Sequence, residues 1–451
     1  MVIGIKTLES KISCRLATTN LTDEELSRLN GAALAIKNSK YSVATISNLP
    51  AASENSGRMV YVEDINAYRF SDGASWINDY NTSYSVISSK LYTWGRNNRC
   101  QLGDGTTTDR SSPGTTAGGG IDWCFTSSGY AKSAAIKTDG TLWTWGGNAN
   151  GQLGDGTTTY RASPVTTAGG GTNWCLVSMG RAPFGGAIKT DGTLWTWGSG
   201  WCGSLGNGTT TSRSSPGTTA GGGTNWCTIQ MGAAGGIAIK TDGTLWTWGC
   251  NYKGELGNGT TTSRSSPGTT VGGGTNWCAA TLMCNNAAAI KTDGTLWTWG
   301  AASYLGNEAA FFNGCRSSPG TTAGGGTNWY KVCVGGRNAS AIKTDGTLWT
   351  WGGNNRGELG DGTTTSRSSP VTTAGGGTNW CSISVGNNNS AAIKTNGTLW
   401  TWGYNNYAQL GDGTTTSRSS PVTIAGGGFN WKMVSVGAAS SSAIEKNITG
   451  F

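Results

Sequence analysis

Histidine does not occur in this 451-residue sequence, which removes the commonest general base and metal ligand among protein side chains. Charged residues are also scarce, at 12% of the chain, so the formal net charge of +8 is weak support for a polyanionic partner. No apolar run approaches the length that spans a bilayer. An enzyme is the least expected class, because no nucleophile stands at a recognisable spacing from a base and an orienting partner.

A secretion signal is also missing, because the first residues, Met1 to Lys6, show no basic region followed by an apolar run. We therefore expect the protein to be made in the cytoplasm. Five of its 12 cysteines occupy one position in an internal repeat, directly after a tryptophan, at Cys124, Cys175, Cys227, Cys278 and Cys381. Other copies have Tyr330 or Lys432 there, which favours a packing residue over a disulfide, metal or redox site. We predict no metal and no cofactor.

The sequence is dominated by a repeat whose most recognisable motif is Thr-Leu-Trp-Thr-Trp-Gly. The second tryptophan of each copy recurs at intervals of 51 or 52 residues, at Trp94, Trp145, Trp197, Trp248, Trp299, Trp351 and Trp402. A fixed period of this size indicates one supersecondary unit copied in tandem, each copy needing its neighbours to bury its apolar face. The two tryptophans of this run, of which the first is replaced by Tyr92 in the first copy, share one face of a strand, which favours packing between units.

One copy shows the elements of the unit. Residues 380–386 and 390–394 predict two strands, Thr395-Asn396-Gly397 a tight turn, and residues 398–403 a third strand. The fourth strand lies around residues 418–423, where a proline indicates an outer edge. Seven such units predict an all-β fold, a seven-bladed β-propeller over residues 83–451. Partial motifs at both ends of the series predict a closing blade that the two ends share.

The repeat also resembles a known family. The Thr-Leu-Trp-Thr-Trp-Gly run, residues 354–362 and Pro370-Val371 are similar to the regulator of chromosome condensation repeat, and the resemblance spans residues 84 to 451. It implies a seven-bladed propeller. It also raises nucleotide exchange on a small GTPase as one possible function, although the near-uniform blades contain no long insertion to act as a wedge.

The N-terminal residues form a different region, which we expect to be a small α+β attachment region. Residues 1–40 predict helices, including a capping box at residues 22–25, and residues 41–82 predict a small β module with strands at 59–62 and 68–70. Residues 46–50, 57–62 and 68–76 resemble β modules of tail-fibre and other virion proteins of marine phages. This resemblance implies attachment to other virion proteins through residues 1–82. Because these residues are too few to be stable alone, we expect a homo-oligomer, with a trimer as one form.

The copies differ mainly in the loops after strand one and after strand three. Antiparallel strands place both loops at the same end of each blade, so one face of the ring is diverse and the other is monotonous. A rigid ring that carries diverse aromatic, Asn and Arg side chains is typical of a recognition surface, although drift among recently duplicated copies explains the same diversity. The candidate contact residues are Arg96, Asn97, Tyr130, Arg181, Phe184, Trp201, Tyr252, Tyr304, Phe311, Phe312, Arg337, Asn355, Tyr404 and Tyr407.

A further repeated element, Leu-Gly-Asp-Gly or Leu-Gly-Asn-Gly, resembles a calcium loop but supplies at most one carboxylate per copy. Calcium sites gather several oxygen ligands, so we predict an Asx turn instead.

The sequence thus favours a non-enzymatic phage virion protein, part of a tail fibre, baseplate or capsid exterior, whose propeller recognises the host surface, with a glycan as the candidate ligand. A passive decoration protein is the first alternative. An exchange-factor-like, protein-binding propeller is the second. Nucleic acid is not an expected partner, because the Lys and Arg of the repeat are spread once per unit around the ring.

Overall fold

The computed structural model describes residues 42–43, 59–62, 67–71, 76–78, 86–233, 235–301, 306, 315–322 and 325–449, with only the backbone before residue 89 and after residue 446. Strands and tight turns make up nearly all of this part of the chain, and its one helical element is the short 3-10 turn η4 (Trp201–Gly203). In the same ranges, no helix is long and apolar enough to cross a membrane.

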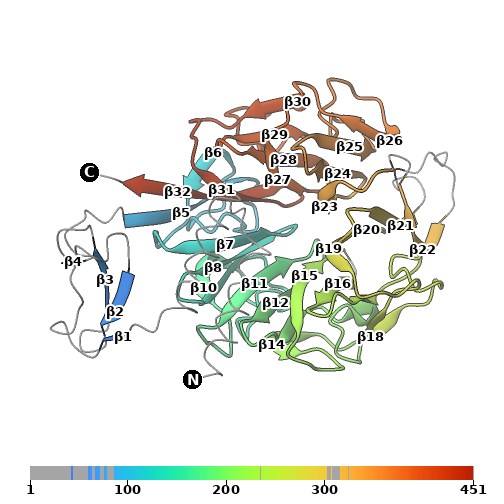
Figure 1. Ribbon diagram of the computed structural model, residues 1–451, viewed down its shortest axis with the longest axis horizontal. Coiled ribbons are helices and arrows are strands. Elements are labelled where there is room, and N and C mark those ends of the chain that lie inside the picture. Colours follow the sequence, from blue (N-terminus) through green and yellow to red (C-terminus); the bar gives the residue numbers. More distant parts are fainter. Residues whose placement is uncertain are drawn as a thin grey trace. The chain divides into compact units, whose positions relative to one another are not determined.

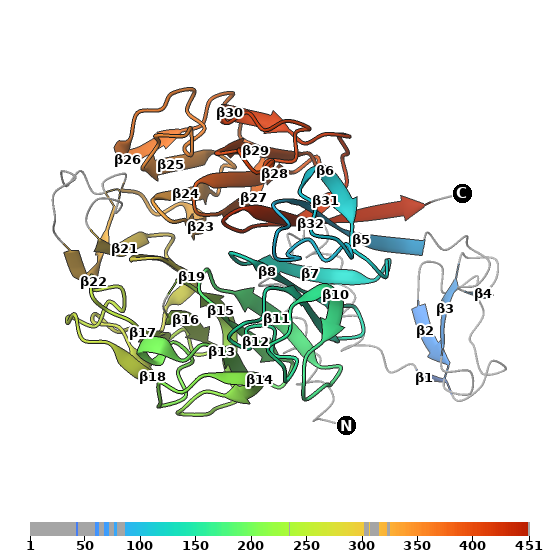
Figure 2. The same cartoon turned by 180° about the vertical axis from the view of Figure 1, so that it is seen from behind.

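Seven four-stranded sheets follow one another around a common centre, as Figures 1 and 2 show. The first strands are β7 (Trp123–Ser128), β11 (Trp174–Met179), β15 (Trp226–Met231), β19 (Trp277–Met283), β23 (Trp329–Val334), β27 (Trp380–Val385) and β31 (Trp431–Val436). The second strands are β8 (Lys132–Lys137), β12 (Phe184–Lys189), β16 (Gly235–Lys240), β20 (Asn286–Lys291), β24 (Asn338–Lys343), β28 (Asn389–Lys394) and β32 (Ser440–Thr449).

The third and fourth strands complete each sheet in antiparallel order. The third strands are β5 (Val86–Gly95), β9 (Leu142–Gly146), β13 (Leu194–Gly198), β17 (Leu245–Gly249), β21 (Leu296–Ala301), β25 (Leu348–Gly352) and β29 (Leu399–Gly403). The fourth strands are β6 (Arg110–Thr115), β10 (Arg161–Thr166), β14 (Arg213–Thr218), β18 (Arg264–Thr269), β22 (Cys315–Thr321), β26 (Arg367–Thr372) and β30 (Arg418–Thr423). The predicted all-β seven-bladed propeller is therefore confirmed.

The position of each strand follows from its sequence. The fourth strand carries the proline and lies at the outer edge of its sheet, where the missing N–H breaks no ladder. The second strand is buried along most of its length and reads as a run of small apolar residues. Between strands two and three, the Asp139 carboxylate accepts the Thr141 N–H and hydroxyl at 2.9 and 2.7 Å, and Gly140 takes a φ of +81° that favours glycine.

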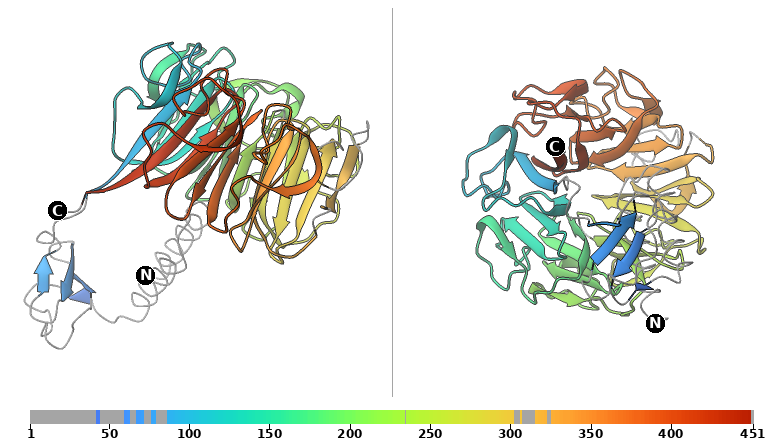
Figure 3. Two further views of the ribbon diagram at one scale, coloured as in Figure 1. Left: turned by 90° about the horizontal axis from the view of Figure 1, so that it is seen from above. Right: turned by 60° about the vertical axis from the view of Figure 1, so that its left-hand side comes forward.

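The first strands lie nearest the centre and contact one another from blade to blade, and Figure 3 shows the blades side by side around that centre. A belt of hydrogen bonds joins them, because a hydroxyl on one first strand accepts a backbone N–H from the next. Ser127 Oγ accepts from Met179 at 2.9 Å, Ser178 Oγ from Met231 at 2.8 Å, and Ser384 Oγ from Val436 at 2.9 Å. Short polar side chains on the first strands therefore connect neighbouring blades.

The seven repeated tryptophans are completely buried between blades. Trp197, for example, packs against Ile136 and Leu142 of the preceding blade. Its indole Nε1 donates to the Gln152 carbonyl at 3.0 Å, and the equivalent bond recurs from Trp94, Trp145, Trp248, Trp299 and Trp402. The predicted packing role of these residues is confirmed. Burial of each indole side chain stabilises the fold by on the order of 3 kcal/mol, and its hydrogen bond fixes the spacing of two neighbouring blades.

The closing blade combines both ends of the repeat series in the order β31-β32-β5-β6. The C-terminal end supplies strands one and two, and the N-terminal end supplies strands three and four. Ser435 Oγ accepts the Ser128 N–H at 2.9 Å, which continues the belt across the closure. The sequence predicted a shared blade but left open which end supplies which strand, and the structure answers that question.

A separate small sheet has the order β1-β2-β3-β4 and comprises β1 (Ser42–Val43), β2 (Met59–Val62), β3 (Ala67–Ser71) and β4 (Trp76–Asn78). Two of these strands confirm the predictions over residues 59–62 and 68–70. The helices expected over residues 1–40 lie outside the described residues, and so does most of the segment that resembles virion modules. The attachment role of this region stays a prediction.

Candidate functional site: the variable loop face

The loops after strands one and three meet at the same end of each blade, as the strand order predicts. In five blades the first residue after strand three donates its N–H to the loop after strand one. Gly147 donates to the Ala131 carbonyl at 2.8 Å and Ser199 to the Pro183 carbonyl at 2.8 Å. Tyr404 donates to Asn388 at 2.9 Å and Arg96 to Ala439 at 2.9 Å, so the closing blade follows the same rule. We call the surface formed by these two sets of loops the variable face.

A buried asparagine shapes most of the loops after strand three. In the second blade of the chain, Asn148 Nδ2 donates to Asp155 Oδ1 at 3.0 Å and to the Thr157 and Thr159 carbonyls at 3.1 Å, while its Oδ1 accepts the Leu153 N–H at 2.9 Å. We call this arrangement the asparagine clasp. Equivalent clasps occur at Asn97, Asn251, Asn354 and Asn405.

The clasp leads directly into the predicted Asx turn, which is confirmed. Asp155 Oδ1 accepts the Thr157 N–H and hydroxyl at 3.0 and 2.8 Å, and its Oδ2 accepts Arg161 Nε at 2.7 Å. Burial alone would raise the pKa of Asp155, but the hydrogen bonds from Arg161, Thr157 and Asn148 outweigh burial and lower it. Within the described residues, no group of three metal-ligating side chains is gathered anywhere. The carboxylate has a structural role in this turn.

Six of the predicted contact residues are exposed on this face. Tyr130 is 43% exposed, Trp201 61% and Tyr252 63%, and Arg181, Arg337 and Asn355 are exposed as well. Arg96, Tyr404 and Tyr407 are half-buried and stack together. The Arg96 guanidinium lies 4.4 Å from the Tyr407 ring centre, and the Tyr404 and Tyr407 rings meet edge to face at 6.1 Å. Tyr304, Phe311 and Phe312 lie outside the described residues, so their contact role stays a prediction.

Two predicted contact residues were wrong. Asn97 is completely buried, because it is the clasp residue of its loop and bonds to Asp104 and Thr106. Phe184 is 1% exposed, because it begins strand β12 and packs into the core with Leu176 and Trp226. Their positions beside variable residues suggested exposure, but the backbone directs both side chains inward.

The sequence analysis missed several residues of this face. Arg99, Lys253 and Arg356 are exposed at loop tips, and the Arg356 guanidinium lies 4.2 Å from the Tyr404 ring centre of the next blade. A disulfide between Cys202 and Cys250 was also missed. The available signal was that these two cysteines depart from the repeat position and follow strand three in consecutive copies. The thiols of the five cysteines at the repeat position each donate to a backbone carbonyl of the second strand at 3.3 or 3.4 Å, which fits the predicted packing role.

The loop tips carry charge of one sign. Between strands one and two, and in the four residues after strand three, the sequence has Arg96, Arg99, Arg181, Lys253, Arg337 and Arg356 but no Asp or Glu. None of these six cations is in a salt bridge within the described part of the chain. Glu255 and Glu358 are buried beneath the tips that carry Lys253 and Arg356, and burial raises the pKa of both. Asp109 is exposed, and its Oδ1 accepts the N–H of Asn97, next to Arg96, at 2.7 Å.

The opposite face differs in charge pattern. Its turns carry exposed aspartates at Asp139, Asp191, Asp242, Asp293 and Asp345. Lysines close to these aspartates lie against pairs of tryptophans, and Lys240 Nζ, for example, is 4.7 and 4.4 Å from the ring centres of Trp226 and Trp246. Acid and base therefore alternate on this face, whereas on the variable face the carboxyl groups that accept the Lys253 and Arg356 N–H groups, Glu255 and Glu358, are buried.

A buried lysine supports part of the variable face. Lys132 is 2% exposed at the start of β8, and its ammonium donates to the Gly180 and Ala182 carbonyls of the next blade, both at 2.7 Å. Burial lowers the pKa of Lys132 to about 7. The held loop presents Arg181, and a shallow cavity of about 250 Å³ lies between Tyr130, Arg181, Ala182 and Ala233. Lys132 fixes the spacing of two loops that carry candidate contact residues.

The fold and this face define a class of protein, a rigid propeller with one variable, basic loop surface. Comparison with known families identifies the repeat itself. The regulator of chromosome condensation (RCC1) repeat matches residues 88–118, 139–182, 242–276, 345–393 and 396–444, and a second form of it matches residues 380–409. The chain folds as a seven-bladed β-propeller, and five segments of it match the RCC1 repeat.

Individual proteins are similar to this chain at modest identity. The ultraviolet-B receptor UVR8 of Arabidopsis thaliana is 28% identical over 303 residues, which covers 66% of this chain and 69% of UVR8. The E3 ubiquitin-protein ligase HERC2 of Mus musculus is 25% identical over 357 residues, covering 76% of this chain but only 7% of HERC2. The crystal structure of Prp20p from Saccharomyces cerevisiae has a TM-score of 0.70 at 17% identity, covering 83% of this chain and 96% of that chain, which concerns the fold alone. None of these three is a phage protein, so they do not support the virion setting.

Proposed function

We propose that this propeller is a non-enzymatic protein-interaction module whose variable face binds an acidic surface or segment of a partner protein. One observation carries the proposal. The loop tips of this face hold six cationic side chains and no carboxylate, and the described ones make no salt bridge. Cations that make no salt bridge and are spaced around a rigid ring attract a partner of opposite charge and orient it before contact.

Exposed aromatic rings supply the apolar part of such a surface. Tyr130, Trp201 and Tyr252 stand at 43, 61 and 63% exposure among the cations. Tyr, Trp and Arg are the residues most often found as energetic hot spots of protein interfaces. The ring fixes their positions through the belt and the interblade tryptophans, so little conformational entropy is lost on binding. We therefore expect the partner segment to combine Glu or Asp with Leu or aromatic residues.

The proposal is tested with an array of immobilised 15-residue peptides that combine Glu with Leu or Phe, together with matched peptides in which Gln replaces every Glu. The full chain is applied at low and at physiological salt. We expect binding to the Glu peptides that weakens with salt, and little binding to the Gln peptides. Equal binding to both sets, or binding to neither, would refute an acid-selective interaction surface.

A host-surface glycan is a second candidate ligand, because the exposed faces of Tyr130, Trp201 and Tyr252 suit stacking on sugar rings. A glycan array probed with the same chain separates the two candidates. Saturable glycan binding without acidic-peptide binding would replace the protein-partner proposal. Attachment to a virion through residues 1–82 and exchange activity on a small GTPase stay predictions. Co-assembly with virion proteins tests the first, and the rate of nucleotide release from candidate GTPases tests the second.

A further inference from the structure

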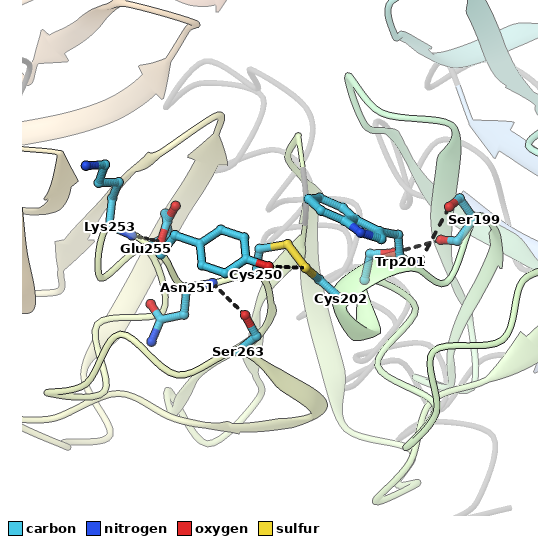
Figure 4. Close-up of a disulfide and its surroundings, with 10 residues drawn as sticks. Ser199, Trp201, Cys202, Cys250, Asn251, Lys253, Glu255 and Ser263 are labelled. Carbon is cyan, nitrogen blue, oxygen red and sulfur yellow. Dashed lines mark hydrogen bonds between the residues drawn. A yellow bond between two sulfur atoms is a disulfide. The ribbon is translucent and has the colours of Figure 1, made fainter.

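One covalent bond crosses between blades on the variable face. Cys202, in the loop after β13, is joined to Cys250, the first residue after β17, across 48 positions of sequence and a Cα to Cα distance of 5.2 Å. Figure 4 shows the two cysteines meeting between neighbouring blades, with Trp201 beside the bond. Cys202 is half-buried whereas Cys250 is 5% exposed, so the bond is accessible from the Cys202 side.

The loop that contains Cys202 lacks the asparagine clasp that shapes its counterparts. Gly200 stands where Asn148 and Asn251 stand in neighbouring copies. A Cβ at Gly200 would lie 2.4 Å from the Thr211 carbonyl oxygen, so the loop has no room for the asparagine. The loop keeps the 3-10 turn η4, the Ser204 hydroxyl bond to the Ser199 carbonyl at 2.7 Å, and the Asx-type turn in which Asn207 Oδ1 accepts the Thr209 N–H and hydroxyl at 3.1 and 3.0 Å. What it lacks are the bonds that the buried asparagine makes in its counterparts.

The loop on the other side of the disulfide keeps its clasp. Asn251 Nδ2 donates to Asn258 Oδ1 at 3.1 Å and to the Thr260 and Thr262 carbonyls at 2.9 and 3.1 Å. Its Oδ1 accepts the Leu256 N–H at 2.9 Å. The disulfide therefore ties a loop without a clasp to a loop that has one, so the ordered neighbour holds the less ordered loop in place.

Trp201 and Tyr252, the two most exposed aromatic residues among those that the structure describes on the variable face, flank this bond. Trp201 directly precedes Cys202, and the Tyr252 hydroxyl lies 3.3 Å from Cys202 Sγ. Trp201 belongs to the loop without a clasp and Tyr252 to the loop that has one. Their relative position therefore depends on the covalent link between the loops.

We propose that the Cys202–Cys250 disulfide is a redox-controlled staple that holds Trp201 and Tyr252 together as one contact surface, and that a dithiol reductant opens it and disables that surface. This inference rests on the proposed function, because it assigns the aromatic anchor of the same partner-binding face.

The chemistry balances with one dithiol per disulfide. A thiolate of the reductant attacks Cys202 Sγ, the accessible sulfur, and the sulfur–sulfur bond breaks with Cys250 leaving as a thiolate that takes a proton. The second thiol of the reductant then attacks the mixed disulfide and releases Cys202 as a thiol. Two electrons and two protons pass to the protein, and the reductant becomes a cyclic disulfide.

The first test follows mobility in the full chain by hydrogen exchange, before and after dithiothreitol. Reduction should speed amide exchange over residues 199–204 by about tenfold and over residues 251–256 by less than about twofold, because only the second loop has a clasp. The variant Cys202→Ser should show the fast exchange without reductant, and Cys100→Ser, a free cysteine in the equivalent loop of the closing blade, should not. Unchanged protection of residues 199–204 in reduced protein would overturn the staple.

The second test measures binding to the acidic peptides described above. Oxidised protein should bind with about tenfold lower Kd than reduced protein or Cys202→Ser, and Trp201→Ala should be weak in both redox states. Equal affinity in the two states, with exchange changed as expected, would overturn control of the contact surface. Absence of peptide binding in either state, with exchange still redox-dependent, would refute the proposed function and leave the staple standing.

Discussion

The asparagine clasp supports a quantitative prediction at Asn354, whose side chain is completely buried. Its Nδ2 donates to Asp361 Oδ1 at 3.0 Å and to the Thr363 and Thr365 carbonyls at 3.1 and 3.0 Å, and its Oδ1 accepts the Leu359 N–H at 2.9 Å. In Asn354→Ala, the Leu359 N–H is left buried without its acceptor and the carboxylate loses a donor. At about 1 to 2 kcal/mol for each of these two losses, the free energy of unfolding should fall by about 3 kcal/mol.

The control for this prediction is the next residue along the chain. Asn355 has the same side chain but is exposed, so Asn355→Ala should change stability by less than about 0.5 kcal/mol. Urea unfolding followed by tryptophan fluorescence compares the two variants, and hydrogen exchange over residues 354–365 locates the effect. If Asn354→Ala proves as stable as Asn355→Ala, the clasp does not order these loops, and the argument about the Gly200 loop fails with it.

Three other predictions concern single residues. The pKa of Lys132 is lowered to about 7 in the folded chain, so the unfolded chain binds more protons between pH 7 and the ordinary lysine pKa. The free energy of unfolding should therefore rise with pH across that window. In urea titrations at several pH values, Lys132→Met should remove this rise. The pKa of Asp155 is lowered in the folded chain, so the stability that its carboxylate contributes is present above the ordinary aspartate pKa and is lost as pH falls through the lowered value. Asp155→Asn should therefore lower the free energy of unfolding by about 1 kcal/mol at neutral pH and by little at pH 2. Gly103→Ala should lower the free energy of unfolding by about 2 kcal/mol or more, because the new Cβ would lie 2.6 Å from the buried Trp145 indole. Gly118 also has a positive φ but has open space around it, so Gly118→Ala should cost only about 1 kcal/mol. Thermal unfolding compares the two variants.

Much of the fold could be predicted because each strand or turn is marked by residues within its own short segment of sequence. The Asp-Gly turns, the edge proline and the paired tryptophans each assign one strand to one place in the blade. Because these signals recur in seven copies, few alternative folds fit the sequence. The assignment of β31 and β32 to one chain end and of β5 and β6 to the other could not be derived in this way. It depends on which partial motifs pair in space, and both ends carry similar ones.

The site was less predictable, because side-chain direction inside a loop does not follow from variability. Asn97 and Phe184 stand beside variable positions, yet one fills the clasp and the other the core. The Cys202–Cys250 bond depends on the distance between two blades, and no spacing within one copy encodes it. Arg99, Lys253 and Arg356 could have been found from the sequence by counting charge at the loop tips, where acidic residues are absent.

The central claim is that the cations of the variable face select an acidic partner. The most direct measurement compares two triple variants of equal net charge for binding to the Glu-containing peptides. Arg181→Gln, Arg337→Gln and Arg356→Gln together remove three charges from the variable face, while Thr241→Glu, Thr292→Glu and Thr344→Glu add three exposed negative charges to the opposite face. We predict about a hundredfold loss of affinity for the first variant and less than about a threefold loss for the second. Equal losses in both variants would mean that only net charge matters, and would contradict the assignment of this face as the binding surface.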